Sequence, residues 1–132
     1  MAAQDHERMQ TIAKAMSGAR AAVGVSALLA PGFASRVMGF PREHDNPTAR
    51  LAGRFFGIRE VLLGAYTAAQ VRRDPVQPEL YLLNAAVDGS DAVVCALTLL
   101  GRRGVARASA GSLAVALPFA ATFLWLRGSC QG

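Results

Sequence analysis

The chain has 132 residues, of which 52% are hydrophobic and 17% charged, and its formal net charge is +5. This length suits one domain of about four helices, and the apolar content is high for a soluble domain. Thirteen of the fourteen basic residues are arginine, and most stand at the ends of apolar stretches rather than among aromatic residues in a polar segment. That distribution argues against nucleic-acid binding. It indicates that the basic residues lie near anionic lipid head groups.

The sequence holds no motif that is typical of a catalytic or cofactor site. It contains no phosphate-binding loop, no H-E-x-x-H motif, no nucleophile elbow, no C-x-x-C pair and no haem attachment sequence. The spacing of Cys95 and Cys130 indicates neither a disulfide framework nor a zinc site. We therefore expect no metal and no cofactor.

The first predicted helix covers residues 9–30, after a flexible polar tail at residues 1–8. Its charge-free part, residues 21–30, is too short to span a bilayer core of about 30 Å. The helix crosses a membrane only if Arg20 lies near the interface and extends toward the head groups, or if Lys14 to Arg20 belongs to the crossing. Pro31 and Gly32 end this helix.

A longer connection follows, and it mixes apolar and charged residues. Phe33 to Gly39 suits a short amphipathic helix that lies on the membrane surface. The turn at residues 45–48 closes the connection, with Asn46 or Thr48 as the N-cap of the next helix.

Three further helices are predicted at residues 48–71, 79–100 and 105–126, and residues 127–132 form a second polar tail. Residues 108–126 contain no charge, which is the clearest transmembrane signal in the chain. Short turns join these helices, so neighbouring helices run antiparallel. The predicted fold is all-α: one four-helix transmembrane bundle in up-down-up-down order, with a short amphipathic segment after the first helix. Basic residues are balanced six against six between the two sides, so they predict no membrane orientation.

The second of these four helices carries small and charged residues on one side. On a helical wheel Gly53, Gly57, Glu60 and Gly64 fall within a narrow arc, Arg50 and Arg54 lie beside it, and Arg59 is roughly opposite. The G-x-x-x-G spacing lets another helix backbone approach closely in a membrane. We therefore expect the three glycines to be helix-packing positions and Glu60 to lie on the packing face.

The third helix carries one continuous polar stripe, formed by Asn84, Asp88, Asp91, Cys95 and Thr98. Asp88 and Asp91 are three residues apart, so their carboxylates are neighbours and need cations beside them. We predict a buried cluster in which Arg54 pairs with Asp88 and Asp91, and in which Arg50, Arg59 and Asn84 take part. Glu60 is either a further member of this cluster or a protonated acid. Such a cluster has three interpretations: a clamp that fixes helix register, a site for protons or a polar ligand, or a contact with a partner subunit.

With these residues in view, the chain resembles the small four-helix DoxX-like membrane proteins over roughly residues 18–126. The resemblance rests on Leu28-Leu29-Ala30-Pro31, Gly39-Phe40-Pro41, the stretch RFFGIREVLLG at residues 54–64 and Asp88-Gly89-Ser90-Asp91. It implies a four-helix transmembrane fold. It implies little about function, since members are mostly described as accessory or redox-linked membrane proteins and many have no assigned role. The chain differs from the pattern in its short first helix and in having Glu60 where an aspartate is expected.

Two hypotheses about function follow from these observations. The first is a non-enzymatic, multi-pass protein of the cytoplasmic membrane that acts as an accessory or interaction subunit, with the bilayer and a larger membrane complex or further copies of itself as partners. The second is a small intramembrane enzyme or carrier that uses Asp88, Asp91 and Glu60 as acid–base groups on an apolar ligand. A soluble helical bundle is disfavoured by the uncharged stretch at residues 108–126.

Overall fold

The structure is a computed structural model that describes residues 2–73, 77–101 and 104–130, and these residues form helices and connecting turns without any strand. The all-α prediction is therefore confirmed for the described part of the chain. The elements in chain order are α1 (Ala2–Leu29), α2 (Pro31–Val37), the 3-10 turn η1 (Arg42–His44), α3 (Pro47–Val71), α4 (Pro78–Leu100) and α5 (Ala106–Ser129).

The helix boundaries follow the sequence closely, except at the ends of the chain. Proline occupies the first turn of α2, α3 and α4, and the Asn46 side chain accepts a hydrogen bond from the Ala49 amide at 2.9 Å, so Asn46 is the N-cap of α3. Residues 2–8, which the sequence places in a polar tail, belong to α1, because this helix begins at Ala2. Residue 1 lies outside the described residues. Residues 2–8 contain no glycine or proline, so the helix continues through them. Their polar side chains favour contact with solvent.

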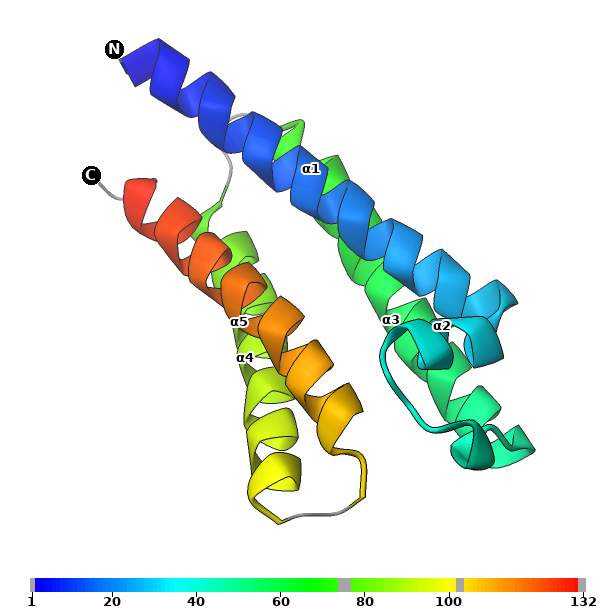
Figure 1. Cartoon of the computed structure of the whole chain (residues 1–132). Helices are drawn as coiled ribbons and strands as arrows, with labels where there is room; N and C mark the ends of the chain where they lie inside the picture. Colours follow the sequence, from blue (N-terminus) through cyan, green and yellow to red (C-terminus); the bar gives the residue numbers. More distant parts are fainter. Residues whose placement is uncertain (1, 74–76, 102–103, 131–132) are drawn as a thin grey trace.

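The long helices alternate in direction, and they form two antiparallel pairs (Figure 1). Helix α1 pairs with α3, helix α4 pairs with α5, and both ends of the chain lie at the same end of the molecule. The predicted turn between α3 and α4 and the one between α4 and α5 include residues 74–76 and 102–103, which lie outside the described residues.

Helices α1 and α3 pack along a narrow stripe of small and polar residues, which we call the α1–α3 seam. An ideal Cβ atom at Gly24 would lie 2.7 Å from the Gly57 carbonyl oxygen, and one at Gly64 would lie 2.8 Å from the Ser17 carbonyl oxygen. Gly53 has only an ordinary contact, with Pro31. The alternating spacing of three and four residues is that of a heptad repeat. The buried seam positions are Ala13, Ser17, Arg20, Gly24 and Ala27 on α1 and Gly57, Glu60, Gly64, Thr67 and Val71 on α3.

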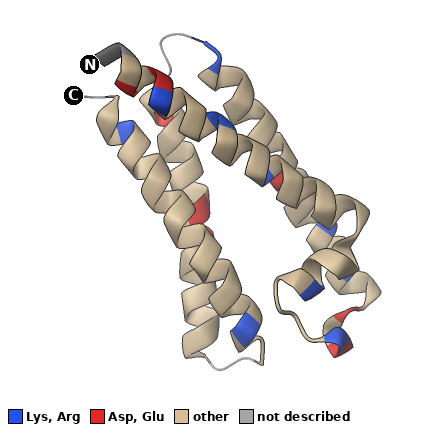
Figure 2. Cartoon of the chain, turned by 45° about the horizontal axis from the view of Figure 1, so that its top comes forward, with Lys and Arg blue, Asp and Glu red and all other residues tan. Residues whose placement is uncertain are grey.

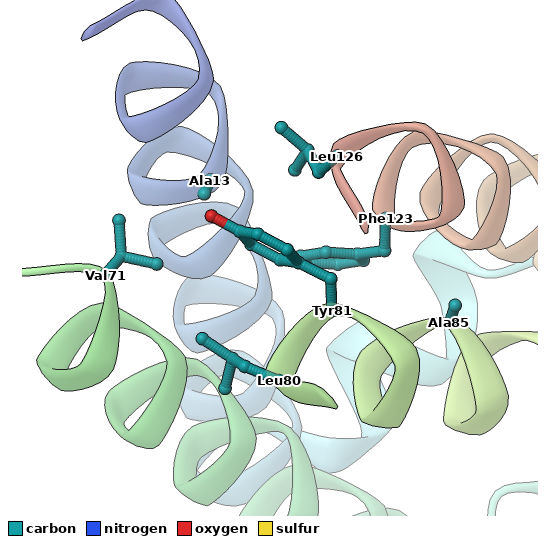
Figure 3. Packing of buried hydrophobic residues seen from close by; sticks show 7 residues of the cluster. All are labelled: Ala13, Val71, Leu80, Tyr81, Ala85, Phe123 and Leu126. Carbon is teal, nitrogen blue, oxygen red and sulfur yellow. The ribbon is translucent and has the colours of Figure 1, made fainter. Parts of the chain in front are cut away.

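The two helix pairs share an apolar core near the ends of the chain (Figure 3). The rings of Tyr81 and Phe123 stack with centroids 6.3 Å apart and an interplanar angle of 27°. All four long helices contribute to this core, whose buried members are Ala13, Val71, Leu80, Tyr81, Ala85, Phe123 and Leu126.

At the opposite end, the segment after α2 lies against the beginning of α5. Gly39 has a φ of +86°, a conformation that glycine adopts without strain. An ideal Cβ atom there would lie 3.5 Å from the Ala108 amide nitrogen, and one at Gly111 would lie 3.5 Å from the Met38 carbonyl oxygen. The helix predicted at residues 33–39 is α2, which begins two residues earlier and exposes Phe33 and Val37.

Within the described ranges, three helices are long and apolar enough to cross a membrane: α1 from Gln4 onward, α4 and α5. Helix α3 does not meet the same measure, although it has 25 residues, because it carries three arginines and a glutamate. Large apolar side chains are exposed along all four long helices, which is typical of surfaces that bind lipid or protein. They include Val25, Leu29, Phe55, Leu62, Val94, Leu97, Leu117 and Leu124.

Candidate functional site: an arginine–carboxylate cluster

Arg20 of α1 occupies the middle of the α1–α3 seam and is only 2% exposed. Its Nη1 donates a hydrogen bond of 2.9 Å to Glu60 Oε2 on α3. Its Nη2 donates to both carboxylate oxygens of Asp88 on α4, at 2.6 and 2.5 Å. The guanidinium carbon lies 5.9 Å from the ring centroids of both Phe119 and Phe123 on α5, so Arg20 contacts all three of the other long helices.

Arg59 makes the second set of ion pairs. Its Nε and Nη2 donate to Glu60 Oε1 at 3.2 and 3.1 Å. Its Nη1 and Nη2 donate to the two carboxylate oxygens of Asp91 at 3.1 and 2.5 Å, in the two-pronged geometry that favours arginine over lysine. The Phe56 ring lies beneath the guanidinium, with 5.1 Å between the ring centroid and Cζ.

These contacts form one chain of alternating charges, which runs Asp88, Arg20, Glu60, Arg59, Asp91 and which we call the arginine–carboxylate cluster. It lies about halfway along the helices, where acidic residues of α4 meet the α1–α3 pair (Figure 2). Each of the six carboxylate oxygens accepts at least one hydrogen bond from an arginine. The cluster therefore joins the two helix pairs through charge-assisted hydrogen bonds.

Burial decreases from one end of the cluster to the other. The side chains of Arg20, Glu60 and Asp88 are 1%, 8% and 9% exposed, whereas those of Arg59 and Asp91 are 39% and 33% exposed. The cluster is therefore buried on the side of α1 and α5 and partly exposed between α3 and α4.

A smaller polar group adjoins the cluster. Asn84, one helical turn before Asp88, donates from Nδ2 to Thr67 Oγ1 and to the Leu80 carbonyl oxygen, both at 2.9 Å. Asn84 and Thr67 are completely buried. Among the described residues, Asn84 Oδ1 and Arg20 Nε have no hydrogen-bond partner.

The predicted pairing of Arg54 with Asp88 and Asp91 is wrong. Arg54 is exposed, and its Nε donates to the Leu28 carbonyl oxygen at 3.4 Å. Helical periodicity predicts which side of α3 a residue faces, but it does not compare positions along the helix axis. Arg54 stands six residues before Glu60, about 9 Å nearer the beginning of α3. Arg20 and Arg59 occupy the position beside the carboxylates instead.

Arg50 also lies outside the cluster, contrary to the prediction. It donates to Asp45 from Nε at 2.7 Å and from Nη2 at 3.1 Å, in the turn before α3. The hydrogen bond from Arg50 holds the pKa of the Asp45 carboxyl below its ordinary value.

The other predicted positions are placed as follows. Glu60 lies on the packing face together with Gly57 and Gly64, and this face packs on α1. Arg59, Asp88 and Asp91 belong to the cluster, and Asn84 belongs to the adjoining polar group. Thr98 bonds only its own helix, through the Val94 carbonyl oxygen.

Arg20 is the cluster member that the sequence analysis missed as a site residue. From the sequence alone, Arg20 only limits how far the first helix can extend into a membrane. The heptad spacing of the small residues around it, Ser17 and Gly24 among them, is the signal that places Arg20 on a packing face.

A pocket of about 340 Å³ lies where α3 ends and α4 begins. Its lining does not include Glu60, Asp88 or Asp91, and within the part of the chain that the structure describes no group of three or more histidine, cysteine or acidic residues could hold a metal ion. The lining consists of Tyr66, Gln70, Arg73, Gln77, Glu79, Leu80 and Leu83.

A scan of the chain against protein-family models found no match, and searches among curated proteins and solved structures found no significant one. The resemblance to DoxX-like proteins therefore stays a prediction.

Proposed function

We propose that the chain is a multi-pass protein of the cytoplasmic membrane in which α3 crosses the bilayer together with α1, α4 and α5. Helix α3 has 25 residues, about 37 Å of helix, which exceeds a bilayer core of about 30 Å. Its central charges, Arg59 and Glu60, are ion-paired. Arg50 and Arg54 stand in its first two turns, where long side chains reach the interface.

Within the membrane, the proposed role is that of a non-catalytic accessory or interaction subunit. The observation that carries this proposal is the exposure of Arg59 and Asp91 halfway along α3 and α4. Charged residues at the centre of a bilayer face the bundle interior, a water-filled cavity or another protein. A partner helix that covers Arg59 and Asp91 would remove the contact of these two charged side chains with lipid.

The side chains around the pair suit such a partner. Phe55 and Leu62, within one turn of Arg59, and Val94, within one turn of Asp91, are each more than half exposed. Membrane helices associate through apolar packing combined with polar contacts of this kind. We call Arg59, Asp91 and these three apolar residues the α3–α4 face.

The alternative of an intramembrane enzyme or carrier has weaker support. Acid–base catalysis requires a carboxyl group that can exchange its partner for a substrate within hydrogen-bond distance. The carboxylate oxygens of Glu60, Asp88 and Asp91 are occupied by arginines, and the pocket lies elsewhere. This arrangement favours a clamp between the helix pairs.

The test is the native size of the protein after mild-detergent extraction from its own membrane. We expect a reproducible assembly larger than the single chain for the parent protein. Val94→Trp, which places bulk on the α3–α4 face, should disrupt that assembly, whereas the matched control Leu117→Trp, on an exposed position of α5, should leave it intact. A parent protein that migrates as a monomer, or an assembly unchanged by Val94→Trp, would contradict the subunit role. Release from the membrane without detergent would contradict the membrane placement itself.

A further inference from the structure

The arginine–carboxylate cluster carries unequal numbers of opposite charges. Arg20 and Arg59 supply two positive charges, whereas Glu60, Asp88 and Asp91 supply three negative ones when ionised, so the cluster has a formal charge of −1. An unbalanced charge costs little free energy in water but much more in a low-dielectric medium.

Among the residues that the structure describes, no other charged residue on the packed helices faces the cluster to restore the balance. On α3, Arg54 turns away to the Leu28 carbonyl, and Arg50 is paired with Asp45. Helix α4 has no further charge between Glu79 and its end, and α5 has none between Arg107 and Arg127 (Figure 2). On α1 the nearest charged residue, Lys14, is exposed and stands six residues before Arg20, about 9 Å along the helix.

The surplus negative charge is located on α4. Glu60 lies between the two arginines and accepts from both, but Asp88 and Asp91 each have one arginine partner. Because they are three residues apart on one helix, their carboxylates are also neighbours of like charge. This like-charge repulsion adds to the cost of the unbalanced charge, and one proton bound by the cluster relieves it.

Two buried atoms beside the cluster give an independent indication. The Arg20 Nε–H is a donor and Asn84 Oδ1 an acceptor, and neither has a partner in the described residues although both side chains are at least 98% buried. A water molecule, which both donates and accepts, would satisfy groups of these two kinds, and water is also the carrier that delivers protons.

We propose that the arginine–carboxylate cluster is a proton-binding site, which holds one proton among its three carboxylates at neutral pH. Binding converts one carboxylate to a carboxylic acid, takes the proton from water and leaves the cluster with no net charge. This proposal rests on the membrane placement proposed above, because a low-dielectric surrounding is what makes the unbalanced charge costly. It does not depend on a partner subunit.

The test counts protonated carboxyl groups by infrared spectroscopy of the purified full-length chain in lipid nanodiscs at neutral pH, where exposed carboxyl groups are ionised. Charge balance predicts one carboxylic acid per chain in the parent protein. It predicts none in Asp91→Asn or Asp88→Asn, where two carboxylates face two arginines. It predicts two in Arg59→Gln, where three carboxylates face one arginine. The control Asp45→Asn, outside the cluster, should keep one.

Three results would overturn the proposal. The first is a parent protein without a carboxylic acid band at neutral pH. The second is a band that survives both Asp88→Asn and Asp91→Asn. The third is a band that is present only after sodium is replaced by choline, because a metal cation would then be the ligand. Each of these is observed on protein already incorporated in nanodiscs, so it is distinguishable from a failure of the membrane placement.

Discussion

Arg20 is the residue on which the connection between the two helix pairs depends most. Replacing it with methionine would leave Glu60 and Asp88 buried without their shared cation. Removal of one partner from a buried ion pair costs about 3–5 kcal/mol, so we expect Arg20→Met to lower the free energy of unfolding by about that amount. The measurement is the denaturation midpoint in mild detergent.

Arg54→Met is the matched control for Arg20→Met, since Arg54 is exposed and makes one long hydrogen bond. A surface substitution of this kind changes stability by about 0.5 kcal/mol or less. Equal effects of the two substitutions would show that Arg20 does not act as a clamp.

Asp45 gives a prediction about pH. Because its hydrogen bond with Arg50 depresses the pKa in the folded protein, the carboxylate contributes stability above its unfolded pKa, and this contribution is lost as the pH falls through the folded pKa. We expect the Asp45 carboxyl to titrate below its ordinary value of 3.8, as followed by NMR of the labelled side chain. Arg50→Gln should raise the midpoint toward 3.8, and an unchanged midpoint would rule out the pair in solution.

At the scale of the helix, the α1–α3 seam depends on glycine. A methyl group at Gly24 would meet the Gly57 carbonyl oxygen at 2.7 Å, so the two helices would have to move apart. Overpacking of this kind costs about 1–3 kcal/mol, and we expect Gly24→Ala and Gly57→Ala each to destabilise the protein by that amount in a thermal unfolding measurement.

Gly18→Ala tests the same chemical change on the same helix. Nothing lies within 4 Å of an ideal Cβ atom at Gly18, and alanine is the better helix former by about 0.5–1 kcal/mol. We therefore expect this variant to be as stable as the parent or slightly more so. A loss similar to that of Gly24→Ala would mean that helix propensity, and not close packing, decides both results.

The helices themselves could be predicted from sequence because apolar runs and proline or glycine punctuation determine them locally. The same reasoning placed Glu60 on a packing face, since glycines at residues 57 and 64 define that face. It could not identify the helix on the other side, because a helical wheel contains no information about the neighbour. The neighbour is α1, so the cation is Arg20 rather than Arg54.

At the scale of the molecule, the two helix pairs meet through the core near the chain ends as well as through the cluster. Phe123 is completely buried against Tyr81, whereas the adjacent Leu124 is 51% exposed. Truncating a buried phenylalanine costs about 3–5 kcal/mol, so we expect Phe123→Ala to lower the unfolding free energy by that amount. Leu124→Ala, on the exposed side of α5, should cost much less, and comparable losses would contradict the observed packing.

The position of Arg20 early in the chain has a consequence for how the protein is made. Glu60 lies 40 residues and Asp88 68 residues further along. At a synthesis rate of about 5–20 residues per second, Glu60 is synthesised about 2–8 s after Arg20, and Asp88 about 3–14 s after Arg20. In the membrane placement proposed above, a lone guanidinium opposes insertion of α1 during that interval, so we expect stable insertion of the first helix to depend on the arrival of α3.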